Sequence, residues 1–84
     1  MIRTAIQLPQ TMSRVQAARI VQLAGHYQSR MMIEHEQTIV NVKSMLGLLS
    51  LCSEVVTGLT LIVEGEDEQA ASEAVLTLLP RAEA

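Results

Sequence analysis

The apolar residues of this 84-residue chain change their spacing along the sequence, and this change restricts the fold more than any other feature. In some stretches every second residue is apolar, which is the period of a strand with one buried face. In others the apolar residues recur at intervals of three and four, the period of a helix with one buried side. The patterns predict strands at 2–8, 31–35, 38–42 and 59–64, and helices at 13–25, at 45–51 and from 66–68 to Pro80.

The first and last helices have recognisable ends. Ser13 is followed three residues later by Gln16, the spacing of a capping box, in which each side chain accepts a hydrogen bond from the other residue's backbone N–H. Gly25 is expected to end this helix. The last helix should carry the carboxylates of residues 66–68 at its positive end and stop at Pro80. The predicted buried stripes are Ala17, Ile20, Val21 and Ala24 in the first helix and Ala71, Ala74, Val75 and Leu78 in the last.

The order of these elements is β-α-β-β-α-β-α. Helices with one apolar side and strands with one apolar face fit two layers, so we expect an α+β fold in which helices cover one side of a four-stranded antiparallel sheet. The second and third strands are expected to be joined by a turn at Glu36–Gln37. A chain of this length has room for one core, which predicts a single domain over residues 1–84.

The composition excludes several classes of function. The chain has no Phe or Trp and only one Tyr, Tyr27, so the core must be aliphatic and stacking on bases is not expected. A net charge of −3 without a basic cluster argues against direct nucleic-acid binding. The single cysteine, Cys52, cannot form an internal disulfide and suits a reducing compartment. No apolar run is long enough to cross a membrane, which predicts a soluble, cytoplasmic protein.

The segment 41–51, Asn-Val-Lys-Ser-Met-Leu-Gly-Leu-Leu-Ser-Leu, joins a strand to a short helix. Ser44 is the expected N-cap of that helix, whose residues are apolar nearly all round. A helix of about two turns cannot bury every apolar side chain that it carries. Two interpretations remain open: the apolar residues are all core, or some of them are exposed beside Ser44 and form a docking surface.

This segment resembles the regulatory-serine segment of HPr, the small phosphocarrier protein of the bacterial sugar phosphotransferase system, and of its paralogue Crh. A second similarity covers Leu61-Ile62 and the acidic stretch 65–70, which is most similar to Crh. Without a gap the resemblance extends over almost the whole chain. It implies an HPr-like fold, an open-faced β-sandwich.

The resemblance also identifies what is missing from a phosphocarrier. The family carries phosphate on a histidine in the motif Gly-[Ile/Leu]-His-Ala-Arg-Pro-Ala, and the aligned residues 11–17 read Thr-Met-Ser-Arg-Val-Gln-Ala. Ser13 therefore stands at the histidine position, Val15 at the arginine and Gln16 at the proline, while Arg14 lies one position too early to replace the arginine. A serine without an adjacent base is a poor acceptor, so we expect phosphate relay to be lost. Crh also lacks this histidine but keeps the arginine and proline.

Ser44 matches the family's second phosphorylated position. In the family, HPr kinase/phosphorylase phosphorylates this serine with ATP, and the modified protein acts with catabolite control protein A in carbon catabolite repression. The resemblance therefore implies a regulatory role for Ser44, a contribution of Lys43 to partner binding, and a contact patch of Met45, Leu46 and Leu49. A phosphate would add a dianion at a helix N-terminus, which the fold should tolerate.

The sequence thus predicts a non-enzymatic, Crh-like regulator with no cofactor and no metal. His26 and His35 lie on different elements without nearby cysteines and are expected to be surface residues rather than metal ligands. Two alternatives stay open: a phosphocarrier with a diverged acceptor site such as Ser13, and an HPr-like interaction domain without phosphorylation.

Overall fold

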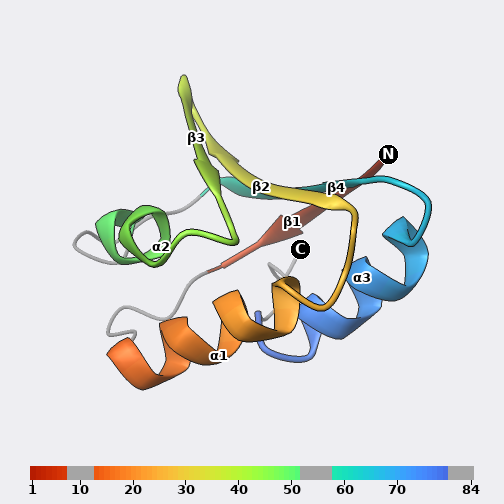
Figure 1. Ribbon diagram of the computed structural model, residues 1–84. Helices are drawn as coiled ribbons and strands as arrows, with labels where there is room; N and C mark the ends of the chain where they lie inside the picture. The colour runs from red at the N-terminus through yellow and green to blue at the C-terminus, as the bar shows by residue number, and fades with distance from the viewer. Residues whose placement is uncertain (8–12, 52–57, 80–84) are drawn as a thin grey trace.

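The computed structural model describes residues 1–7, 13–51 and 58–79, and its elements follow the predicted order (Figure 1). The predictions for Leu8, Pro9, Cys52 and Pro80 fall outside these residues. The elements are β1 (Ile2–Ile6), α1 (Arg14–Ala24), β2 (Arg30–His35), β3 (Thr38–Asn41), α2 (Met45–Leu51), β4 (Leu59–Glu64) and α3 (Glu68–Leu76).

The four strands form one antiparallel sheet in the order β1-β4-β2-β3. The register aligns the inward positions of neighbouring strands, because Leu61 lies opposite both Thr4 and Ile33. Ile33 in turn lies opposite Val40 on β3. Since side chains alternate between the two faces of a sheet, this row directs one apolar face of every strand toward the same layer.

The helices cover that face and close an aliphatic core (Figure 1). Tyr27 is only partly buried and packs against the edge of the core, so the core does not depend on aromatic packing. The predicted fold class and the aliphatic core are therefore confirmed. The buried cluster consists of Ile6, Ala17, Ile20, Ala24, Met31, Ile33, Val42, Leu48, Leu51, Leu59, Leu61, Val63, Ala71, Val75 and Leu79.

The opposite face of the sheet carries polar side chains over an apolar centre. Arg3 on β1 and Glu34 on β2 form an ion pair at 3.2 Å that reaches across the intervening strand β4. Ile62 of β4 lies opposite Arg3 and is only 5% exposed, although it points away from the helices. Long charged side chains often cover apolar surface with their stems in this way.

The N-terminus of α1 contains the predicted capping box. The Ser13 Oγ accepts a hydrogen bond from the Gln16 backbone N–H at 3.2 Å, and the Gln16 Oε1 accepts one from the Ser13 backbone N–H at 3.0 Å. The helix ends at Ala24, with Gly25 as its C-cap in the right-handed region, so this glycine does not use its freedom to adopt a positive φ. These two reciprocal hydrogen bonds engage the side chains of both Ser13 and Gln16.

Replacing Ser13 with alanine should lower the free energy of unfolding by about 1 kcal/mol, because the cap to the Gln16 amide is lost while the helix remains. Chemical denaturation followed by circular dichroism measures this change. Arg14→Ala is the matched control, since Arg14 is an exposed neighbour outside the capping box and its loss should be nearly neutral. A neutral Ser13→Ala variant with impaired partner binding would contradict the structural role.

The C-terminal end of α3 corrects one prediction. The helix ends at Leu76, and Leu78, which was expected in the buried stripe, is 39% exposed, whereas Leu79 is fully buried. The Val75 carbonyl accepts hydrogen bonds from the backbone N–H groups of both Leu78 and Leu79, each at 3.0 Å, so the four-residue spacing of an α-helix continues to Leu79. Ala71, Val75 and Leu79 are fully buried and Ser72 is 4% exposed, whereas Ala74 is only partly buried, so the buried side follows a four-residue spacing and is rotated away from Leu78.

The start of α3 is attached to the loop that follows α1. Asp67 is the N-cap residue, but its carboxylate makes no cap bond to its own helix. Instead the carboxylate accepts hydrogen bonds from the backbone N–H groups of Gln28 and Ser29, each at 2.9 Å, and from the Ser29 hydroxyl. We call this set of bonds the Asp67 latch. Of the three predicted carboxylates, only Glu68 lies in the first turn of the helix.

The latch should make stability depend on pH. The hydrogen bonds from the Ser29 hydroxyl and the Gln28 backbone hold the pKa of Asp67 below its ordinary value of 3.8. A carboxyl group whose pKa is lowered by folding stabilises the fold when it is ionised. The stabilisation by Asp67 is therefore present above pH 3.8 and is lost as the pH falls through the lowered pKa. Urea unfolding over this acid range should show a decline in the wild type that is reduced in Asp67→Asn. Equal slopes in both proteins would contradict the latch.

Candidate regulatory site

The turn between β3 and α2 fixes the position of Ser44. The Asn41 side-chain Oδ1 accepts the Lys43 backbone N–H at 2.8 Å, and the Asn41 carbonyl accepts the Ser44 backbone N–H at 3.0 Å. The Ser44 Oγ then accepts the Gly47 backbone N–H at 3.2 Å. Ser44 therefore caps the helix as predicted, through one of the backbone donors that has no partner within the helix.

The helix that Ser44 caps divides its apolar side chains between the core and the solvent. Leu48 is fully buried and Leu51 is 7% exposed, whereas Leu46 is 82% exposed. Met45 and Leu49 lie between these extremes and pack against the edge of the core. The interpretation in which every apolar residue of this segment is core is wrong, because Leu46 lies in solvent two positions after Ser44.

Lys43 is held by a contact that the sequence does not indicate. Its side chain is half-buried, and its Nζ donates a hydrogen bond to the backbone carbonyl of Tyr27 at 2.8 Å. This bond joins the turn before α2 to the loop after α1. Since an ammonium group has three donors, two remain for other groups.

The N-terminus of α1 carries the residues aligned with the family's histidine motif. Ser13, Arg14, Val15 and Gln16 are all exposed, and Val15 is 63% exposed. The Ser13 hydroxyl and the Gln16 side chain are engaged with each other's backbone, as described above. The exposed apolar side chain of Val15 thus occupies the position where the family's motif has an arginine. Helix α1 packs against α2.

The two histidines lie on different parts of the fold. His26 is exposed after α1, and His35 is half-buried at the end of β2. Within residues 1–7, 13–51 and 58–79, no group of three or more His, Cys, Asp or Glu side chains is arranged to hold a metal ion. The same residues contain no helix that is long and apolar enough to span a membrane.

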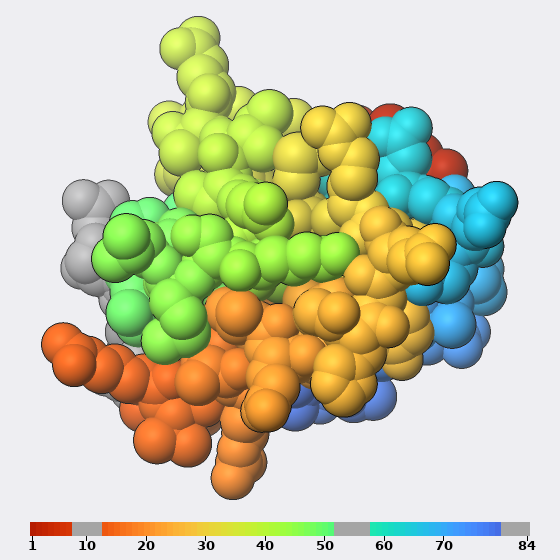
Figure 2. All heavy atoms as spheres, in the orientation of Figure 1, coloured from red at the N-terminus to blue at the C-terminus, as the bar shows by residue number. Residues whose placement is uncertain are grey.

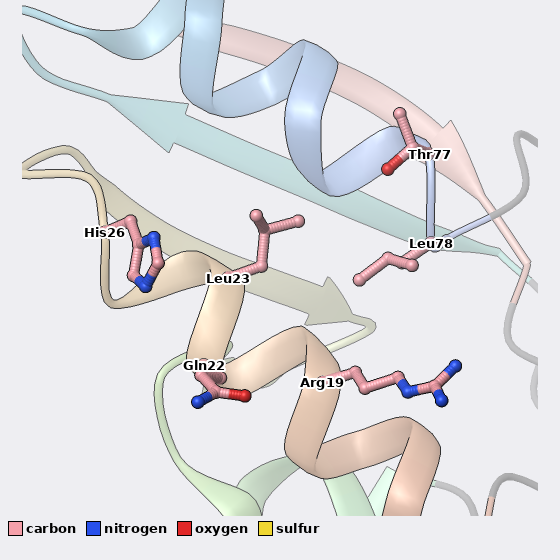
Figure 3. A pocket seen from close by; sticks show the side chains of 6 residues that line it. All are labelled: Arg19, Gln22, Leu23, His26, Thr77 and Leu78. Carbon is pink, nitrogen blue, oxygen red and sulfur yellow. The ribbon is translucent and has the colours of Figure 1, made fainter.

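A cavity of about 380 Å³ lies between α1 and the segment after α3, away from the predicted site (Figure 3). Leu23 and Leu78 point toward one another across it, and polar side chains surround them. None of the residues predicted for partner binding or phosphorylation lines this cavity. Its lining residues are Arg19, Gln22, Leu23, His26, Thr77 and Leu78.

Comparison with known sequences identifies relatives of two kinds. The family model described as "PTS HPr component phosphorylation site" matches residues 2–81. The HPr-like protein Crh of Halalkalibacterium halodurans is 42% identical over 65 residues, which cover 77% of each chain. Crh of Bacillus subtilis is 46% identical over 57 residues, covering 68% of this chain and 67% of that one.

Solved structures show the same architecture. A crystal structure of Bacillus subtilis Crh, in which a swapped domain forms an intertwined dimer, superimposes with a TM-score of 0.70 at 35% identity and covers 92% of this chain and 82% of that one. Phosphocarrier protein HPr of Bacillus anthracis superimposes with a TM-score of 0.73 at 29% identity, with 93% of each chain covered. The match over residues 2–81, the Crh relatives and the shared open-faced sandwich together establish that this chain belongs to the HPr family of phosphotransferase-system proteins.

Proposed function

We propose that the protein is a Crh-like regulator of carbon catabolite control that is switched by phosphorylation of Ser44 and does not relay phosphate. The observation that carries this proposal is the position of Ser44 at the start of α2, two residues before the exposed Leu46. A hydroxyl that can accept a phosphoryl group and an apolar side chain that a partner can contact therefore lie two residues apart, at the cap and in the first turn of the same short helix.

Phosphorylation would change the partner surface more than the fold. A phosphoserine carries about −1.5 to −2 charges, and the free amides at a helix N-terminus favour such a group. The dianion would lie next to Met45 and near Leu46 and Leu49, where it opposes a purely apolar or acidic partner. It favours a partner that offers an arginine to the phosphate and an apolar surface to Leu46.

The loss of phosphate relay follows from the chemistry at the start of α1. A serine hydroxyl has no basic nitrogen to accept a phosphoryl group, and the Ser13 oxygen is already an acceptor for the Gln16 amide. Val15 supplies no charge to stabilise a phosphoryl group, and the Gln16 side chain is directed back to the Ser13 backbone. These contacts support a capping role for Ser13.

The proposed partners are HPr kinase/phosphorylase, which would modify Ser44, and catabolite control protein A, which would bind the modified form. Val15 stands at the position of the family's arginine. Any contact that this arginine makes with catabolite control protein A would therefore have to be replaced by an apolar contact. Neither role requires catalysis by this protein, and we propose that it is not an enzyme.

The direct test is incubation of the purified protein with HPr kinase/phosphorylase and ATP, read by intact mass and by localisation of the modified residue. We expect a single phosphoryl group on Ser44. Ser44→Ala should remain unmodified, whereas Ser50→Ala, which removes another hydroxyl of α2, should be modified normally. Modification elsewhere would exclude Ser44 as the switch, and no modification would favour the HPr-like interaction domain without phosphorylation.

A second reaction tests the phosphocarrier alternative. Enzyme I with phosphoenolpyruvate should leave the protein uncharged, because the acceptor histidine is absent. Ser13→His alone should restore little charging, since Val15 and Gln16 still differ from the motif. An acid-labile phosphoryl adduct on the wild-type protein under these conditions would support a diverged acceptor and contradict the proposed loss of relay.

A further inference from the structure

A small cleft between the start of β2 and the end of β3 gathers positive charge in an acidic protein. The cleft has a volume of about 150 Å³ and is lined by Gln28, Arg30, Met31, Met32, Asn41 and Lys43. Two of the six basic residues of the chain line it, and no carboxylate does, although the net charge is −3. Figure 2 shows the segments that contribute, yellow-orange for residues near 30 and green for residues near 43, meeting on the visible face.

The cationic side chains of this cleft retain donors for a ligand. Within the described residues Arg30 makes no ion pair, even though Glu64 lies opposite it on β4. The Lys43 ammonium uses one of its three donors on the Tyr27 carbonyl, which leaves two for a ligand. The nearby Asp67 carboxylate is bonded to the backbone of Gln28 and to Ser29 and does not line the cleft.

Two amide side chains add neutral donors. The Asn41 Oδ1 is occupied by the Lys43 backbone N–H, which leaves the Asn41 side-chain N–H groups for a ligand. Gln28 contributes a second side-chain amide from the other wall of the cleft. The volume lies below the roughly 300–1,000 Å³ of pockets that hold drug-sized ligands, so the cleft suits a small group.

We propose that this cleft binds a dianionic phosphoryl group, with Arg30 and Lys43 supplying two positive charges and the Gln28 and Asn41 side-chain amides supplying further donors. Two cations match a dianion, whereas a carboxylate would neutralise only one of them. The cleft lies just before Ser44 in the chain and involves neither that hydroxyl nor the start of α1. The site shares Lys43 with the residues predicted for partner binding, but it does not require a phosphate on Ser44 and is tested on the unphosphorylated protein.

The experiment is a titration of the isotope-labelled protein with inorganic phosphate, followed by amide NMR shifts at constant ionic strength. We expect saturable shifts confined to residues 28–32 and 41–43. Arg30→Gln should weaken binding about tenfold, the expected loss of a charge-assisted hydrogen bond. Arg19→Gln removes the same charge from α1, outside the cleft, and should leave the affinity unchanged.

Further titrations identify the chemical class of the ligand. Glycerol 3-phosphate in place of phosphate distinguishes a phosphomonoester from the free anion, and either one binding in the cleft supports the proposal. Acetate should bind much more weakly. Equal binding of acetate, no saturable shift with either phosphate, shifts centred outside the cleft, or equal weakening by Arg19→Gln would each overturn it. Lys43→Gln, checked for stability because of its bond to Tyr27, should weaken binding as Arg30→Gln does.

Discussion

Gly65→Ala is expected to lower the free energy of unfolding by roughly 2–5 kcal/mol, through combined backbone strain and overpacking. Gly65 has a φ of +154°, a conformation that residues with a side chain rarely adopt. A Cβ at this position would lie 2.7 Å from the Ser29 Cα and 2.6 Å from the Ser29 Oγ. The backbone atom cannot move aside without moving the loop, and the hydroxyl is held by the Asp67 latch.

A second glycine separates strain from crowding. Gly58 has a φ of +75°, but an added Cβ would meet no atom within 4 Å. Gly58→Ala should therefore cost only the strain of a positive φ, about 1–2 kcal/mol. Chemical denaturation of the two variants measures the difference. A Gly65→Ala variant no less stable than Gly58→Ala would show that the close approach to Ser29 does not exist.

Leu48→Ala should destabilise the protein by about 2–5 kcal/mol, whereas Leu46→Ala should change stability by less than about 0.5 kcal/mol. The two residues lie two positions apart in α2 and lose the same atoms. Leu48 is fully buried and Leu46 is 82% exposed, so only the first substitution leaves a cavity. Urea unfolding of both variants checks the predicted contrast, and similar losses would mean that α2 is rotated from the position described.

Leu46→Ala then provides the cleaner test of partner binding. Because the variant should stay as stable as the wild type, a weaker complex can be attributed to the lost contact rather than to unfolding. Leu49 is half-buried and packs against the core, so Leu49→Ala should combine some loss of stability with any loss of binding. A Leu46→Ala variant that binds the partner at full strength would remove Leu46 from the proposed contact patch.

The fold could be predicted because the spacing of apolar residues and the residues at turns and helix ends determine each helix or strand locally. The alternating residues of β1 and β4 and the capping box of α1 require no knowledge of distant segments. The hairpin at Glu36–Gln37 was predicted from its flanking strands alone, and Glu36 adopts a φ of 55° that is uncommon for a residue with a side chain. The pattern of the flanking strands therefore located the hairpin even though Glu36 and Gln37 are not the residues preferred in tight turns.

The contacts that escaped prediction join segments far apart in sequence. Asp67 was expected to serve its own helix, but its carboxylate bonds to a loop 38 and 39 residues away. Lys43 was expected to face partners, but its Nζ also bonds to Tyr27. Leu78 was placed in the core by the predicted stripe, but the buried side continues from Val75 to Leu79 instead. No local pattern indicates which remote carbonyl or amide a polar side chain will reach.

The candidate site was predictable in part for the same reason. A hydroxyl that precedes an apolar run indicates a cap, and Ser44 accepts the Gly47 amide as expected. How α2 divides its leucines depends on its rotation against the core, which the seven-residue segment does not determine by itself. The cleft lined by Arg30 and Lys43 was missed because its walls are 13 residues apart and meet only through the sheet.

The central place of β4 has a consequence for how the chain is made. Among the described residues β1 pairs only with β4, and β2 pairs with β4 as well as with its hairpin partner β3. During translation the first strand therefore has no partner until Leu59–Glu64 leaves the ribosome. Until then the nascent chain can form little more than the helices α1 and α2 and a two-stranded hairpin, which is marginal alone, so the sheet can assemble only after β4 has been made.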